Sequence, residues 1–198
     1  MDPESAWEYE AGVIQGFKDL TIRAAGWYYD IKNFINDNGI TAPGSGLGTN
    51  CLYNIDEVRL YGAELEVAMR LSERFRATAA YVYQNYSVDH TGFEQEWTYY
   101  LPALLPRNKI KLLARYMVWK DGWLQVSSRF VDEREAQKGE ELDAYAILDV
   151  GFEQKFNFNG LEYTAKAFVN NLTGTSYQEQ AGYTMPMQVW GFQVGVSF

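Results

Sequence analysis

Hydrophobic and polar residues alternate along nine stretches of this chain, and a period of two residues predicts β-strands. Successive side chains of a strand point to opposite faces of a sheet, so each stretch would have one apolar and one polar face. One stretch, residues 108–119, also fits the apolar stripe of a helix. We predict an all-β fold with strands at residues 8–17, 20–35, 58–71, 75–88, 108–119, 123–131, 144–156, 161–171 and 190–198.

The connections between these strands alternate between short and long. Short turns are predicted at residues 18–19, 72–74, 120–122 and 157–160, and longer segments lie at residues 36–56, 89–107, 132–143 and 172–187. Membrane barrels have this arrangement, with tight turns at the periplasmic rim and long loops on the extracellular side. The pattern therefore favours an antiparallel, up-and-down transmembrane β-barrel.

The central charged residues of five predicted strands, at residues 58–71, 75–88, 108–119, 144–156 and 161–171, lie on one face of their strand. Glu64 and Glu66 alternate with Leu65, and Lys111 and Arg115 lie opposite the apolar positions of their own strand. A basic side chain that faces lipid near the membrane centre costs about 2 to 4 kcal/mol. We therefore expect Glu64, Glu66, Lys111 and Arg115 to face the barrel lumen, where they line a hydrated interior or contact a solute.

A soluble β-sandwich or lipocalin-like barrel would show the same alternation, because parity does not distinguish a protein core from lipid. Two features favour the membrane. The strands are long enough to span a bilayer when tilted, and several aromatic residues lie near strand ends, namely Trp7, Trp119, Trp123 and Trp190.

The final strand points to the same compartment. Its apolar residues alternate with small or polar ones up to a terminal aromatic residue, a pattern that resembles the signal by which outer-membrane barrels are recognised for assembly. The residues of this predicted assembly signal are Trp190, Phe192, Val194, Val196 and Phe198.

Composition narrows the range of partners. The chain has 17 Lys and Arg against 26 Asp and Glu, a net charge of −9, which argues against a nucleic-acid partner. No run of 18 apolar residues predicts a transmembrane helix. The single cysteine, Cys51, excludes an internal disulfide and is read as a small loop residue in preference to a thiol that pairs outside the chain. The first five residues lack the features of a secretory signal, which was either removed or lies outside this sequence.

Several motifs resemble those of TonB-dependent outer-membrane receptors, the plugged barrels that import scarce nutrients. Residues 61–66, YGAELE, are similar to the family's G-x-E-x-E strand, and residues 105–109, LPRNK, to the start of another strand. Residues 170–177, NNLTGTSY, resemble the Asn-Leu box that precedes the last loop. Residues 3–12, PESAWEYEAG, the Gly182-Tyr183 pair and the Phe-terminated strand complete a match across nearly the whole chain.

The sequence also departs from the family pattern. Residues 186–188 are PMQ where the family usually has Pro-Gly-Arg, and Thr173-Gly174 replaces a common Phe-Asp. The family barrel has about 22 strands around a plug, whereas nine strands and no plug are predicted here. In a closed barrel of nine antiparallel strands, the first and last strands would run in the same direction and pair as parallel neighbours. The resemblance therefore implies that residues 1–198 are the carboxyl-terminal part of such a barrel, with the plug domain absent.

The resemblance implies transport across the outer membrane of a Gram-negative bacterium. The full-length protein would import a siderophore, cobalamin or a similar bulky ligand by TonB-dependent active transport. Expected partners are outer-membrane lipid, the barrel-assembly machinery, the small-molecule ligand, and TonB through the missing plug. The alternative is a small standalone barrel that acts as a pore, an adhesin or a scaffold. Candidate ligand-facing aromatic residues are Trp97, Tyr99, Tyr100 and Tyr183. An aromatic girdle at the membrane interface or packing within the loop is the favoured alternative for the first three.

Nothing in the sequence favours an enzyme, a cofactor or a metal site. Ser87, Asp89 and His90 lie too close together on an extended strand to converge as a triad. Residues 36–39, NDNG, have the composition of a calcium loop, but the twelfth position counted from Asp37 is Gly48, which cannot supply the bidentate carboxylate. A turn is the favoured interpretation of this segment.

Overall fold

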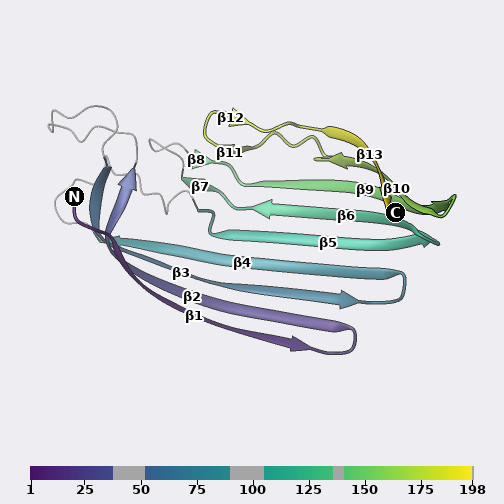
Figure 1. Ribbon diagram of the computed structural model, residues 1–198. Helices are drawn as coiled ribbons and strands as arrows, with labels where there is room; N and C mark the ends of the chain where they lie inside the picture. The colour runs from purple at the N-terminus through teal and green to yellow at the C-terminus, as the bar shows by residue number, and fades with distance from the viewer. Residues whose placement is uncertain (38–51, 90–104, 136–140, 198) are drawn as a thin grey trace.

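The computed structural model describes residues 1–37, 52–89, 105–135 and 141–197, and every regular element in them is a β-strand. Nine strands form one antiparallel sheet whose spatial order follows the sequence (Figure 1). They are β1 (Ser5–Gly16), β2 (Leu20–Asp37), β3 (Leu52–Arg70), β4 (Phe75–Asp89), β5 (Asn108–Trp119), β6 (Gly122–Val131), β9 (Tyr145–Phe158), β10 (Leu161–Asn170) and β13 (Val189–Ser197). The prediction of an antiparallel all-β fold is confirmed, and residues 108–119 form a strand and not a helix.

Four short strands lie in the longer connections and were not predicted. β7 (Arg134–Glu135) pairs with β8 (Glu141–Leu142), and β11 (Gln178–Gln180) pairs with β12 (Tyr183–Thr184). Both pairs lie at the end of the sheet opposite the short turns (Figure 1). The long connections therefore add small hairpins to one rim.

The tight turns join β1 to β2, β3 to β4, β5 to β6 and β9 to β10. The last of them is an Asn-Gly turn, because Asn159 and Gly160 have φ angles of 52° and 79° and β9 continues to Phe158, two residues further than predicted. Asn and Gly tolerate this left-handed backbone and so permit a two-residue hairpin. Asp121 has a φ of 62° in the turn between β5 and β6.

The strand register separates the side chains into two faces. On what we call the apolar face, Leu65 lies beside Tyr81 and Leu112 beside Ala79 and Ser128. This face is uncovered in the structure: Leu112 is 51% exposed, Trp190 70% and Phe192 71%. Burying such side chains is the main favourable term in the folding of a water-soluble protein. A sheet that leaves them outside is suited to an apolar solvent.

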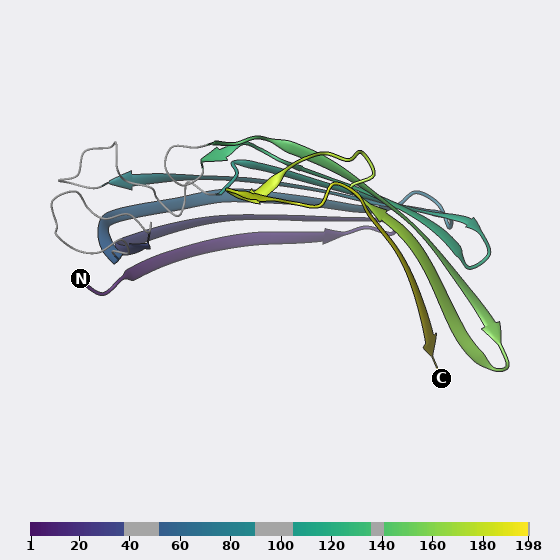
Figure 2. The same cartoon turned by 90° about the horizontal axis from the view of Figure 1, so that it is seen from above.

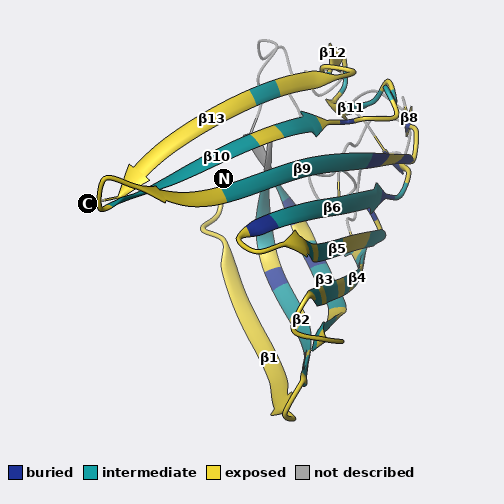
Figure 3. Cartoon of the chain, turned by 90° about the vertical axis from the view of Figure 1, so that its right-hand side faces the viewer, coloured by how far each residue is buried: buried dark blue, intermediate teal, exposed yellow. Residues whose placement is uncertain are grey.

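Most of the buried hydrophobic residues lie on the opposite face, which we call the polar face. Val58 is fully buried beside Ile31, and a second cluster contains Val131, Tyr145 and Ile147. Both clusters lie towards the rim with the long connections, because β3, β6 and β9 end or begin there. The burial map shows little buried surface elsewhere (Figure 3).

Two glycines on the polar face lie under aromatic rings. Gly62 is directly opposite Trp27, whose ring would lie 2.4 Å from an added Cβ. Gly191 is opposite Phe168, whose ring would lie 2.1 Å from an added Cβ. A ring that covers a strand glycine replaces the side-chain packing that glycine lacks. The glycine of the YGAELE motif thus makes room for Trp27.

The sheet is curved and open, with β1 and β13 as its two edges. β9, β10 and β13 bend away from the plane of β1 to β6 (Figure 2), and the two edge strands are largely exposed (Figure 3). Since β1 and β13 are the first and last of nine antiparallel strands, they run in the same direction. Among the described residues, no helix is long and apolar enough to cross a membrane.

Candidate functional site

A row of six residues, four of them charged, crosses six neighbouring strands on the polar face. The register places Arg23, Glu66, Ala80, Lys111, Arg129 and Ile147 side by side on β2 to β6 and β9. Arg23 forms an ion pair with Glu66. Lys111 lies directly opposite Arg129, so two positive charges are cross-strand neighbours.

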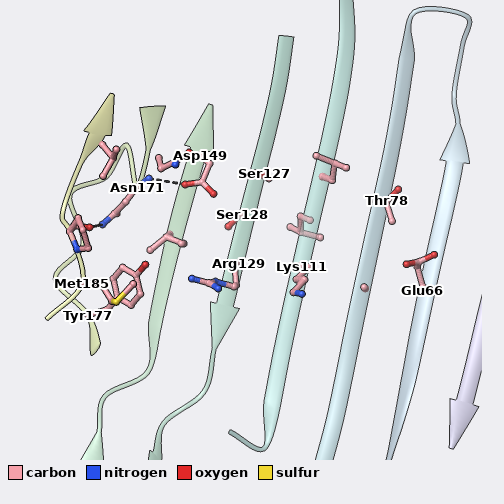
Figure 4. A pocket seen from close by; sticks show the side chains of 17 residues that line it. Glu66, Thr78, Lys111, Ser127, Ser128, Arg129, Asp149, Asn171, Tyr177 and Met185 are labelled. Carbon is pink, nitrogen blue, oxygen red and sulfur yellow. Dashed lines mark hydrogen bonds between the residues drawn. The ribbon is translucent and has the colours of Figure 1, made fainter. Parts of the chain in front are cut away.

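A pocket of about 650 Å³ opens above this row. Its wall is the polar face, with Lys111, Arg129 and Asp149 among the lining residues, and Tyr177 and Met185 from the segment between β10 and β13 lie at its side (Figure 4). The volume lies within the usual range for small-molecule sites, about 300 to 1,000 Å³. The fold thus provides a ligand-sized hollow on the polar side of the sheet.

Glu179 fastens the β11–β12 hairpin to the polar face. Its carboxylate lies 3.2 Å from Arg129 Nη2 and 3.6 Å from Arg134 Nη2, and it accepts a hydrogen bond of 2.6 Å from the Tyr145 hydroxyl. Arg134 also donates to the carbonyl oxygens of Gln178 and Glu179. The Arg134 side chain is only 5% exposed. A buried guanidinium needs hydrogen-bond acceptors, and those of Arg134 belong to the β11–β12 hairpin. These contacts hold the hairpin against the polar face.

The ring of Tyr145 extends this contact. The Tyr177 ring lies 4.4 Å from it, centroid to centroid, and the Arg129 guanidinium carbon lies 5.7 Å from it. Both distances fall within the range of aromatic and cation–π contacts. Arg129 is therefore held on two sides, by Glu179 and by Tyr145, at the edge of the pocket.

Asn171 organises the start of the segment that borders the pocket. It is 3% exposed, with a φ of 52°, and its backbone N–H donates to Asp149 Oδ1 at 2.7 Å. Its side-chain amide donates to the carbonyl oxygens of Thr175 and Pro186 and accepts from the Thr175 N–H. One buried amide thus joins both ends of the segment.

A second row of basic residues lies closer to the short turns. Arg70, Arg76 and Arg115 are directly opposite one another on β3, β4 and β5. The guanidinium carbons of Arg76 and Arg115 lie 5.6 Å and 5.2 Å from the ring of Trp123. We predicted Trp123 only as an aromatic residue near a strand end. Its place on the polar face follows from its parity with Gln125, Ser127 and Arg129.

The structure brings together two of the four predicted lumen-facing residues. Glu66 and Lys111 both line the pocket. Glu64 lies one row closer to the long connections, between Ala25 and Val82, and Arg115 belongs to the second basic row.

The predicted ligand-facing aromatic residues and the predicted assembly signal do not line the pocket in the part of the chain that the structure describes. Tyr183 is an exposed residue of β12. Trp97, Tyr99 and Tyr100, like Cys51, His90 and Phe198, lie outside the described residues. Trp190, Phe192, Val194 and Val196 form the apolar face of β13.

Sequence reasoning missed Arg129, Arg134, Tyr145, Tyr177 and Glu179 as parts of one site. Arg129 could have been found, because its parity in residues 123–131 places it beside Lys111. Glu179 gave no local signal, since it acts on residues 34 to 50 positions away in the chain. In the described ranges, no three His, Cys, Asp or Glu side chains are grouped as metal ligands. The arrangement offers binding by charge, hydrogen bonds and aromatic contact.

Comparison with known proteins gives a family match. The family model described as TonB dependent receptor-like, beta-barrel matches residues 1–172. No curated protein matches the chain.

Solved structures share the fold. The copper transporter OprC has a TM-score of 0.79 and 15% sequence identity, with 98% of this chain and 31% of that protein covered. The ferric-catecholate import receptor Fiu from E. coli K12 has a TM-score of 0.72 and 18% sequence identity, with 98% of this chain and 27% of that protein covered. BauA, the ferric preacinetobactin receptor from Acinetobacter baumannii, has a TM-score of 0.73 and 17% sequence identity, with 100% of this chain and 30% of that protein covered. The chain therefore spans less than a third of the proteins that it resembles.

Proposed function

The chain belongs to the TonB-dependent receptor-like β-barrel family, and we propose that it forms the carboxyl-terminal part of the wall of such a receptor in the outer membrane of a Gram-negative bacterium. The polar face lines the lumen, and the apolar face contacts lipid. The short turns lie at the periplasmic rim and the long connections outside the cell. A separate plug, which would contact TonB, lies outside this chain.

The exposed apolar face carries this proposal. Leu112 and Phe192 are more than half exposed, while Val58, Val131 and Ile147 on the polar face are buried. In water, a protein would bury the apolar face and expose the polar face, because burying an apolar side chain stabilises the protein by about 1.5 to 3 kcal/mol. In a bilayer the same face meets hydrocarbon. Further support comes from the family match and from the open sheet, whose edge strands β1 and β13 each lack a second partner strand among the described residues.

The proposed activity is the import of a siderophore, cobalamin or a similar bulky ligand with energy relayed by TonB. The chain would contribute the pocket bordered by Lys111, Arg129 and Tyr177, and the outer ligand contacts would include Trp97, Tyr99, Tyr100 and Tyr183. Glu64, Glu66 and Arg115 would line the hydrated lumen. The alternating residues of β13 would be read by the barrel-assembly machinery. The function is binding and transport, without chemical change of the ligand.

An uptake assay tests the proposal. The complete protein that carries this chain is expressed in a Gram-negative host that lacks its own receptors, with and without TonB. Accumulation of labelled ferric siderophores and of labelled cobalamin is then measured. We expect uptake of at least one ligand that is lost without TonB. Uptake of small solutes that does not need TonB would instead identify a passive pore and overturn the proposal.

A further inference from the structure

Two rows of like charges cross the polar face, and the described residues compensate one of them more fully than the other. On a sheet, like charges directly opposite each other are destabilising. The first row contains Arg70, Arg76 and Arg115, and the second contains Lys111 and Arg129. The two rows differ in what neutralises them.

The row near the short turns is compensated by protein groups. Arg70 Nη2 lies 2.6 Å from Asp19 Oδ1, and Arg115 Nη2 lies 3.6 Å from Glu153 Oε1. Trp123 lies beside the guanidinium groups of both Arg76 and Arg115. Two carboxylates and one indole ring therefore compensate the charge of three guanidinium groups, through ion pairs and cation–π contacts.

The row beside the pocket is compensated only in part by the residues that the structure describes. Glu179 is shared between Arg129 and Arg134, and Glu66 is engaged by Arg23. Lys111 is exposed and forms no hydrogen bond or ion pair with any residue that the structure describes. Lys109, two residues earlier on the same face, also has none within the described ranges. The second acid of the pocket, Asp149, accepts a hydrogen bond from the backbone of Asn171.

The excess of positive charge extends over three strands. The polar face of β4, β5 and β6 carries no Asp or Glu, and its basic residues are Arg76, Lys109, Lys111, Arg115 and Arg129. The whole chain, in contrast, has a net charge of −9. A concentrated positive field on one wall of a pocket attracts anions and raises their local concentration.

We propose that this pocket binds the oxyanion groups of a small, multiply charged ligand, such as phosphates or carboxylates, through Lys111 and Arg129. This inference rests on the proposed function, because the ligand would be the one that the receptor imports. Thr78 and Ser127 line the same pocket and supply hydroxyl donors. Tyr177 and Met185 supply apolar contact with the uncharged part of the ligand.

The test is a binding titration with defined probes. The complete protein that carries this chain is purified in detergent and titrated with inorganic pyrophosphate and with citrate by isothermal calorimetry at two salt concentrations. Lys111→Gln is compared with Lys111→Arg and with Lys32→Gln, which removes an exposed lysine from the opposite face of β2. Loss of a charge-assisted hydrogen bond should weaken binding about tenfold in Lys111→Gln.

We expect saturable binding of at least one probe, unchanged in Lys32→Gln, largely retained in Lys111→Arg and less salt-dependent in Lys111→Gln. Binding that is equal in Lys111→Gln and wild type would overturn the inference. So would a lower melting temperature of Lys111→Gln without any change in binding, which would assign Lys111 to a contact with an acidic plug surface.

The uptake assay separates this inference from the proposed function. A protein that imports a ligand with the help of TonB but binds neither probe keeps the proposed function and overturns the anion site. A protein that binds a probe through Lys111 but supports no uptake keeps the site and overturns the proposed function.

Discussion

Gly62 shows how a single residue without a side chain shapes the polar face. An added Cβ would lie 2.4 Å from both the Trp27 ring and the backbone carbonyl oxygen of Tyr83. The ring could move aside, but the carbonyl belongs to the neighbouring strand and cannot move without disturbing the ladder. We predict that Gly62→Ala lowers the stability of the barrel by about 1 to 3 kcal/mol, measured as a lower midpoint of thermal unfolding by circular dichroism.

Gly26 provides the matched control for Gly62. It lies on the adjacent strand, and a Cβ there would meet only the Gly62 carbonyl oxygen at 3.6 Å, an ordinary contact. Gly26→Ala should therefore unfold close to the wild-type temperature. Equal midpoints for the two variants would show that the tight packing around Gly62 does not limit stability.

Asn171 acts at the same scale through its hydrogen bonds. Its amide both donates to and accepts from the segment that follows it. Asn171→Asp keeps the size but replaces the donor with an acceptor that would face the carbonyl oxygen of Thr175. We predict that this variant loses about 1 to 3 kcal/mol and that proteases cleave residues 172–188 more rapidly. Asn170→Asp, one residue earlier and exposed, should leave the cleavage rate unchanged.

At the scale of an element, the β11–β12 hairpin is held by the carboxylate of Glu179 together with the hydrogen bonds from Arg134 to its backbone. Glu179→Gln would remove the ionic partner of Arg129 and of the buried Arg134. We predict that the hairpin detaches more often, so that limited proteolysis within residues 178–184 becomes several times faster. The control is Glu162→Gln, whose ion pair with Lys155 is exposed on both sides and should contribute less than about 1 kcal/mol. Equal cleavage rates in the two variants would contradict the role of Glu179.

The same hairpin marks the limit of what the sequence predicts. The nine long strands and the facing of Glu66, Lys111 and Arg115 follow from a period of two sustained over at least nine residues and from the high cost of charge in lipid. Strands of two or three residues, such as β11 and β12, are too short to show a period. The role of Glu179 depends on the packing of a distant connection, and a local pattern carries no information about that.

At the scale of the whole molecule, the two faces should respond differently to charge. We predict that Leu65→Lys, on the exposed apolar face of β3, prevents assembly in the outer membrane, because a lysine facing lipid costs about 2 to 4 kcal/mol. Ala68→Lys places the same charge on the polar face near Glu66 and should assemble. The measurement is the fraction of heat-modifiable protein in isolated outer membranes. Equal assembly of both variants would argue against lipid contact on the apolar face.

The spatial order of the nine strands repeats their order in the chain, and each strand pairs only with its neighbours in that order. Loss or duplication of two consecutive strands would therefore leave the inside and outside faces of every remaining strand unchanged. Both ends of the remaining strands would also stay at their original rims. A gene that encodes such a wall can change the circumference of its barrel one hairpin at a time, without redesigning any strand that it keeps.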